Sequence, residues 1–443
     1  MRIALVTPHA TPPDPTTLAG RTPHLIPLAQ AVAGDGHDVH VYARKDSPAL
    51  PPTLEVPPNV KIEHVTAGPA GWLDPDDLVP HVRAFGDYLA KRWRDDTPDV
   101  VHAYSWPSGL AAFAVARELD IPIVQTFHSL AGPAGKYSHW YPREPLARLK
   151  LKVSLARNVQ AVIARSSEEM RRLVRLGVPR SSIKVVPWGV DTSHFAPEGP
   201  VAERDERARL LAFLPPDGHP GIEIVLRALV DVPGAELVLV GGPEQAARQR
   251  SRRGGRGQQS GARRSPAQGE RAVEKLQHDL MRLAGRFKVA DRVSFLSDVS
   301  WDDLPALLRS ADLLVTTETD GMFDETALQA MACGTPVVAP AEGFYPDAVI
   351  DGTTGLLVPP GQPGVLALRV RRLLASSLQL EAFGIAAADR ARSRYSWDRI
   401  GRETVHAYER CVTHPLAPVD EAAEQADEAE QAGDEAAYLE AAG

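Results

Sequence analysis

The pattern of apolar and polar residues in the first half of the chain alternates between two kinds of segment. Short runs rich in Val and Ile are apolar nearly throughout, which is typical of strands buried on both faces of a parallel sheet. Between them lie stretches with helical spacing, such as residues 27–38 ("PLAQAVAGDGHD"), where Gly34 and Gly36 end the helix. This alternation predicts a doubly wound α/β sheet. The predicted strands are residues 2–8, 38–44, 60–68, 98–104, 121–129 and 161–166.

The same pattern restarts after Asp191, and this predicts a second α/β sheet. The polar segment 193–207 between the halves lacks any apolar period, so we divide the chain into domains 1–198 and 199–415. Two Rossmann-like sheets that face one another would form a cleft at the carboxyl ends of their strands, where such folds bind ligands. The last helix, predicted at 397–411, is expected to cross back to the first domain. The predicted strands of the second half are residues 208–216, 235–242, 291–299, 311–318 and 335–342.

Two segments fall outside this pattern. Residues 245–269 are rich in Arg, Gly, Gln and Ser, and are expected to form a disordered insertion. Its arginines either face solvent or touch phosphates; no aromatic residues are interleaved for base stacking, so we expect no specific nucleic-acid binding. Residues 416–443 form an acidic tail with nine Asp and Glu and no Lys or Arg. Without those nine acids the net charge of −8 becomes +1, so the folded body is nearly neutral.

Composition places the chain among ordinary globular proteins. It has 443 residues, of which 44% are apolar and 24% charged, enough for two domains with real cores. Two cysteines are too few for a disulfide framework, and Cys333 lies among small residues as a packed apolar side chain. No run approaches the ~18 apolar residues of a membrane span. We therefore expect a cytoplasmic protein without a membrane span.

Four stretches of the sequence carry its most specific motifs: "HATPPDPTTLAGRTPHLIPLAQAVAGDGHDVHVYAR", "PDVVHAYSWPSGLAAFAVARELDIPIVQTFHSL", "VVPWGVDTSHFAP" and "ALQAMACGTPVVAPAEGFYPDAVIDGTTGLLVPPG". They resemble the family 4 glycosyltransferases, and together the resemblance covers Arg2 to Cys411. It implies the GT-B fold of two facing Rossmann-like domains, and retaining transfer of a hexose from a nucleotide-sugar donor to an acceptor that the sequence does not identify. It also implies no metal site and no resident cofactor.

The charged residues that the family pattern places in the donor site are replaced in this sequence. A diphosphate leaving group gains negative charge as the glycosidic bond breaks, and cationic side chains must stabilise it. The family pattern has Arg and Lys near the first strand of the donor domain, and two Glu flanking the donor helix. Here Pro215 and Pro220 replace the cations, and Gly321 and Gln329 replace the acids. Gln329 retains hydrogen-bonding capacity for a ribose.

The resemblance also implies roles for further site residues. Glu325 is the candidate for the missing carboxylate; alternatively it is an acid favoured by the helix dipole in a first turn. His128 either contacts the donor sugar or is satisfied within its loop. Gly20 belongs to the acceptor loop, and Arg21 either binds an acidic acceptor or is an exposed structural residue. The implied donor-binding residues are Gln329, Thr326, Phe323, Gly321, His219 and Gly241.

Other enzyme classes lack their signatures. The segment after the first strand, "VTPHATPPDP", has no G-x-G-x-x-G loop for a nicotinamide cofactor. A serine hydrolase elbow and a paired-His metal site are also absent from the sequence. Two functions remain open: a glycosyltransferase with an altered donor site, and a non-catalytic GT-B relative that binds a ligand or a protein partner.

Overall fold

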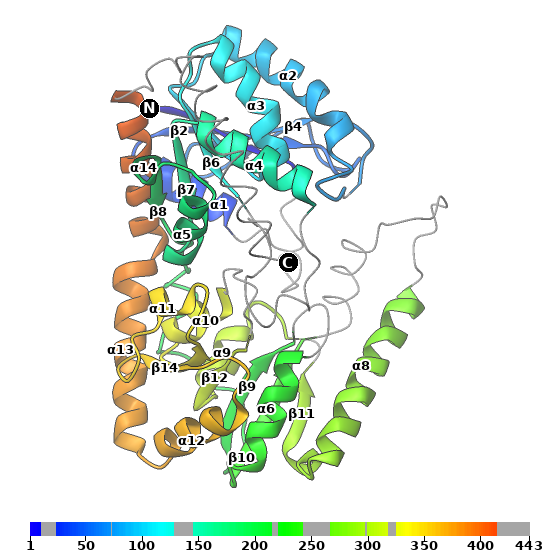
Figure 1. Ribbon diagram of the computed structural model, residues 1–443, viewed down its shortest axis with the longest axis vertical. Coiled ribbons are helices and arrows are strands. Elements are labelled where there is room, and N and C mark those ends of the chain that lie inside the picture. The colour runs from blue at the N-terminus through cyan, green and yellow to red at the C-terminus, as the bar shows by residue number, and fades with distance from the viewer. Residues whose placement is uncertain are drawn as a thin grey trace, which may run out of the picture.

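The computed structural model contains two mainly parallel β-sheets, each covered by helices on both faces (Figure 1). The structure describes residues 1–9, 24–71, 73–127, 145–214, 220–241, 266–296, 299–317 and 325–413. Within these residues the first sheet has eight strands in the order β3-β4-β2-β1-β5-β6-β7-β8, and only the pair β3–β4 is antiparallel. Its strands are β1 (Arg2–Thr7), β2 (Asp38–Arg44), β3 (Thr53–Val56), β4 (Val60–Val65), β5 (Val100–Tyr104), β6 (Ile123–Thr126), β7 (Ala161–Ala164) and β8 (Ile183–Val185).

In the described part of the chain, the second sheet has six parallel strands in the order β11-β10-β9-β12-β13-β14. This order, in which the third strand lies at one edge and the first beside the fourth, is that of a Rossmann sheet. The strands are mostly apolar because helices cover both faces. They are β9 (Ala208–Phe213), β10 (Ala235–Val240), β11 (Val293–Leu296), β12 (Leu313–Val315), β13 (Val337–Pro340) and β14 (Gly355–Val358).

Helices complete two layers on each sheet. On the first sheet, α2, α3 and α4 pack into one core, and α1 and α14 pack into the other. On the second sheet, one core contains α9, α10, α11 and α13, and the other contains α6, α8 and α12. The first-half helices are α1 (Leu25–Gly34), α2 (Val82–Asp95), α3 (Trp106–Glu118), α4 (Leu146–Asn158) and α5 (Ser167–Arg175). The later ones are α6 (Pro220–Val230), α8 (Pro266–Arg286), α9 (Leu304–Arg309), α10 (Glu325–Ala332), α11 (Tyr345–Ala348), α12 (Pro363–Leu374), α13 (Ser377–Tyr395) and α14 (Trp397–Thr413).

The described residues pass between the two sheets twice, and the two crossing segments touch. After β8, the N–H of Val190 donates to the carbonyl oxygen of Tyr395 at 2.7 Å, just before α14. Gly189 has no room for a side chain, because a Cβ there would lie 2.6 Å from the ring of Trp397. From this junction α13 and α14 run along one side of the molecule, and α14 packs on α1 (Figure 1). The two segments that cross between the sheets therefore pack against each other as a single connection.

The strands predicted from the sequence are all present, and the prediction of two parallel α/β sheets is confirmed. The sequence pattern missed β3, β8 and β14, which are three or four residues long and lie at sheet edges. The predicted insertion ends earlier than expected, because α8 begins at Pro266 and a proline suits the first turn of a helix. Residues 242–265 and the tail from 414 lie outside the described residues. No helix in the described ranges is long and apolar enough to cross a membrane.

Candidate donor site between the two domains

The donor side of the site is built where the second sheet reverses its strand order, between β9 and β12. Ligands of open α/β sheets bind at such points, outside the carboxyl ends of the strands. The helices that follow these two strands, α6 and α10, both begin there. Gly221 at the start of α6 has no room for a Cβ, which would lie 2.1 Å from Oγ1 of Thr317, just after β12. The start of α6 is therefore packed tightly against the end of β12.

Three of the predicted donor-site residues lie on α10. Glu325 is its first residue, where a carboxylate is favoured by the helix dipole, and Thr326 follows. Gln329 lies one turn after Glu325, so the two share a helix face, and its side chain is only 7% exposed. Gly241 follows β10 with a φ of 139°, which favours glycine, and its N–H donates to the carbonyl oxygen of Leu296 at 3.0 Å. These four residues follow the carboxyl ends of β10 and β12, which lie in one sheet on either side of β9.

Glu325 is held by a residue of the other domain. Its carboxylate forms an ion pair with Nδ1 of His24, the residue before α1, and the two side chains are only 20% and 12% exposed. The ring of His24 stacks on Trp188 with 3.2 Å between centroids and 15° between planes. His24 was not predicted, although its place after the glycine loop and before the first helix was a signal. The contact brings the segment after β1 against the segment after β12.

Trp188 also contacts a buried cation. The guanidinium of Arg165, at the end of β7, lies 5.0 Å from the centre of the Trp188 ring. Arg165 is 5% exposed, and its Nε donates to Glu169 at 3.1 Å. Because Glu169 neutralises it, this arginine is already paired within the first domain. The described contacts thus form a continuous series of Glu325, His24, Trp188, Arg165 and Glu169.

Several predicted residues lie outside the described residues, so the structure places none of them. They are His128, His219, Gly321, Phe323, Gly20 and Arg21, and Pro215 is another. Pro220 is described only as the first residue of α6. Arg227, one of the nearest cations in the sequence, pairs with Glu223 at 2.5 Å on the outer surface of α6.

Two residues near the site are structural. His102 is buried between the hydroxyl groups of Tyr408 and Thr126, at 2.6 Å and 2.8 Å, and burial lowers its pKa to about 3. It is neutral, which fits a packing role. Burial raises the pKa of the Cys333 thiol to about 12, so Cys333 is the packed apolar side chain expected. In the described residues, no group of three or more His, Cys, Asp or Glu is placed to hold a metal.

Ser105 has a backbone conformation that sequence reasoning gave no reason to expect. It joins β5 to α3, where the first sheet reverses its strand order, and its φ is 75°. A residue other than glycine in this region is held there by its surroundings. Its N–H donates to Thr126 at 2.9 Å, and its carbonyl oxygen accepts from Nε2 of Gln125 at 3.0 Å. Ser105 thus lies at the point of the first sheet that corresponds to the donor site of the second.

Comparison with known proteins identifies the family. The family model described as "Glycosyltransferase Family 4" matches residues 20–194, and that described as "Glycosyl transferases group 1" matches residues 217–390. A D-inositol 3-phosphate glycosyltransferase of Streptomyces bingchenggensis is 30% identical, over 92% of this chain and 89% of the relative. The chain belongs to the family 4 glycosyltransferases. The enzyme of the same name in Mycobacterium tuberculosis strain H37Ra is also 30% identical, over 93% of this chain and 83% of its own.

Solved structures agree on the fold of this glycosyltransferase. A sucrose-phosphate synthase from Thermosynechococcus elongatus superposes with a TM-score of 0.72 at 24% identity, and covers 93% of this chain and 99% of its own. Anabaena HepE, solved in complex with UDP and glucose, gives a TM-score of 0.63 at 18% identity, covering 92% of this chain and 99% of its own. The prediction of a GT-B fold is confirmed.

Proposed function

We propose that this glycosyltransferase binds a nucleotide sugar through the start of α10 and transfers its hexose, with retention, at a greatly reduced rate or not at all. The observation that carries the proposal is the joint replacement of four polar anchors by Pro215, Pro220, Gly321 and Gln329. The buried strands and the packed α10 are retained around them. Each lost phosphate donor in such a site costs about 10²–10³-fold in rate.

The contact between His24 and Glu325 supports a reduced rate. Glu325 is our candidate for the missing carboxylate, but its carboxylate contacts the imidazole of His24, and both side chains are mostly shielded from solvent. To act on a sugar, the carboxylate would have to leave His24. We propose that Gln329 and Thr326 hydrogen-bond the nucleotide, with Gly241 and the loop residues Phe323, Gly321 and His219 lining the donor side. His128 would then contact the donor sugar, and Gly20 and Arg21 would face the acceptor.

The relatives suggest which acceptor to try first. Because they are named for D-inositol 3-phosphate, we propose a phosphorylated polyol as the acceptor class. The alternative is a relative that binds a ligand or a protein partner without catalysis. The four replacements favour this alternative, because they remove the charged side chains that would act on the donor and leave the fold intact.

Mass spectrometry of the unmodified protein, incubated with a panel of nucleotide sugars and acceptors, tests the proposal. We expect little or no transfer, and turnover at about 1 per second or more would contradict it. The variant Pro215→Arg, Pro220→Lys, Gly321→Glu, Gln329→Glu is expected to raise donor hydrolysis or transfer. Gln379→Glu, at an exposed position on α13, is the matched control and should change nothing.

Calorimetry with UDP, GDP and ADP tests the binding part separately. We expect weak nucleotide binding, because two phosphate cations are replaced by prolines. Tight binding that depends on the diphosphate would overturn this interpretation of the donor site. No binding to the unmodified protein and none to the restored variant would favour the alternative, a relative that binds a protein partner.

A further inference from the structure

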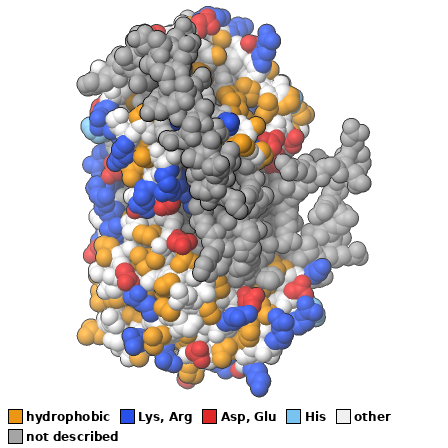
Figure 2. Space-filling view, viewed as in Figure 1, with side chains coloured by type: hydrophobic (Ala, Val, Ile, Leu, Met, Phe, Trp, Pro, Cys, Tyr) orange, Lys and Arg blue, Asp and Glu red, His pale blue; other side chains and the backbone are white. Residues whose placement is uncertain are grey.

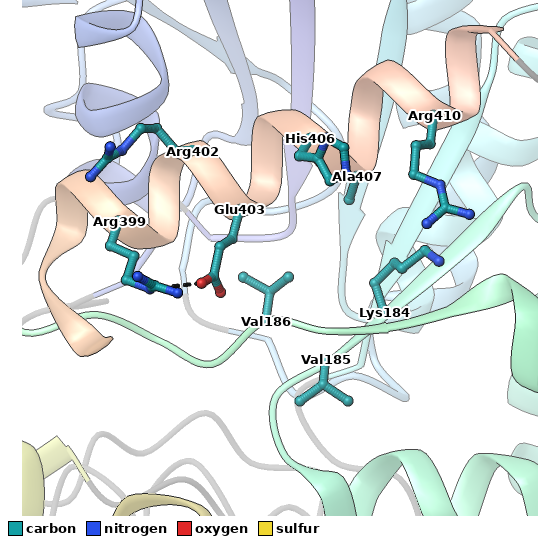
Figure 3. Close-up of a pocket in the computed structure, with 9 residues that line it drawn as sticks. All are labelled: Lys184, Val185, Val186, Arg399, Arg402, Glu403, His406, Ala407 and Arg410. Atoms are coloured by element: carbon teal, nitrogen blue, oxygen red, sulfur yellow. Dashed lines mark hydrogen bonds and ion pairs between the residues drawn. The ribbon is translucent and has the colours of Figure 1, made fainter. Parts of the chain in front are cut away.

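A basic groove lies between the edge strand β8 and the helix α14, outside the donor site (Figure 3). Its volume is about 440 Å³. Val185, Val186 and Ala407 supply its apolar lining, and charged side chains of both elements flank it. We call this the α14 groove. Its full lining is Lys184, Val185, Val186, Arg399, Arg402, Glu403, His406, Ala407 and Arg410.

The α14 groove carries unneutralised positive charge. Arg399 and Glu403 pair with each other at 2.8 Å and cancel (Figure 3). Among the described residues, no carboxylate pairs with Lys184, Arg402 or Arg410, and both arginines are exposed. Burial and the nearby charges of Arg410 and Arg180 lower the pKa of Lys184. Lys and Arg side chains also gather on the side of the molecule where α14 and α5 lie (Figure 2). A polyanion on the groove would relieve this repulsion.

The end of α14 leads from the groove into the acidic tail. α14 ends at Thr413, three residues after Arg410, and the first acid of the tail is Asp420. The six residues between them, "HPLAPV", are a common length for a connection between two antiparallel segments. The cationic or titratable residues of α14 recur at intervals of three or four positions: Arg399, Arg402, His406 and Arg410. The acids of the tail recur at one to four positions: Asp420, Glu421, Glu424, Asp427, Glu428, Glu430, Asp434 and Glu435.

We propose that the α14 groove is a binding site for an acidic polypeptide segment and that its occupant is the chain's own tail, residues 420–440. Nine carboxylates lie within that segment, opposite three unpaired cations. A tethered segment has an effective concentration in the millimolar range, so weak attraction is enough for occupancy. The groove has no Trp, Tyr or Phe side chain on which a nucleic-acid base could stack, only the imidazole of His406, and its apolar lining is too small for a lipid surface. The tail would hold β8 and α14 together beside the connection between the domains.

The test measures how a free copy of the tail competes with the tethered one. A full-length variant carries Asn or Gln at the nine acidic positions, which leaves the groove vacant. Fluorescence anisotropy then follows binding of a labelled peptide of residues 416–443 to this variant and to the native chain. We expect the neutral-tail variant to bind the peptide at least about 10-fold more tightly than the native chain does. Binding should weaken strongly when salt rises from about 0.05 M to about 0.3 M.

Substitutions in the α14 groove test whether the peptide binds there. In the neutral-tail background, Lys184→Gln with Arg402→Gln and Arg410→Gln is expected to reduce peptide affinity at least about 10-fold. Arg286→Gln with Lys288→Gln and Arg372→Gln removes three exposed cations of the second domain and serves as the control. Equal binding by the groove and control variants would overturn the proposal, as would equal binding by the native and neutral-tail chains. Groove-dependent binding of the native chain to vesicles of anionic lipid or to polyuridylate would also overturn it, because the groove would then be free.

Discussion

At the residue scale, His102 shows how the first domain treats a polar group in its core. The imidazole lies on β5 and is bonded on both nitrogens, to the hydroxyl groups of Tyr408 and Thr126. Tyr408 belongs to α14, 306 positions later in the chain. Because the site is fully buried, protonation would place an unpaired charge in the core, and the pKa falls from 6.5 to about 3. His102 thus ties α14 to the first sheet only while it is neutral.

This predicts acid sensitivity with a definite sign. The unfolded chain binds a proton at His102 near pH 6.5, whereas the folded chain does not until about pH 3. Stability from this residue is therefore complete above pH 6.5 and is lost as the pH falls. Between pH 7 and pH 5 the loss is about 2 kcal/mol. Urea denaturation of the native chain and of His102→Asn should show the larger loss in the native chain; parallel losses would contradict the assignment.

At the element scale, the start of α6 shows why a helix of the donor domain begins where it does. Thr317 follows β12 and fills the space beside Gly221, so a side chain at 221 cannot be accommodated. Two segments that are far apart in sequence therefore set each other's position at the donor site. A larger residue would push α6 away from the strand that precedes α10.

Gly221→Ala is expected to lower the stability of the second domain by about 1–3 kcal/mol, because the new Cβ would lie 2.1 Å from Oγ1 of Thr317. Adding Thr317→Ala removes that oxygen and should restore part of the loss. Gly364→Ala, near the start of α12 where a Cβ meets no atom within 4 Å, is the control. Thermal denaturation of the single and double variants measures the coupling. Strictly additive losses would show that the two residues do not interact.

At the scale of the whole molecule, a few polar contacts supplement the connection between the two sheets. Besides the pair of His24 and Glu325, the N–H of Ser167 at the start of α5 donates to the carboxylate of Asp347 on α11 at 2.6 Å. Both contacts join segments near the carboxyl ends of strands in the two sheets. These contacts fix the position of one half of the candidate site relative to the other.

Asp347→Ala is expected to destabilise the folded arrangement by about 1–3 kcal/mol, because it leaves the N–H of Ser167 without its carboxylate. Asp347→Asn keeps an acceptor oxygen and should behave almost like the native chain. Small-angle scattering should show a larger radius of gyration for Asp347→Ala combined with His24→Ala. Unchanged scattering and stability in that double variant would mean that the covalent connections and α14 alone fix the arrangement.

The sequence alone determined the two parallel sheets and the family. Strands buried on both faces must be apolar along their whole length, so local composition reveals them, and the turn "MACGTP" marks α10 and β13. The short edge strands escaped prediction because three or four residues carry no period. Only the tertiary structure decided that His24 pairs with Glu325, that Thr317 occupies the space beside Gly221, and that β8 and α14 form a basic groove. Each of these depends on residues distant in the chain, whose proximity follows from strand order and from the return of α14, and local sequence does not encode either.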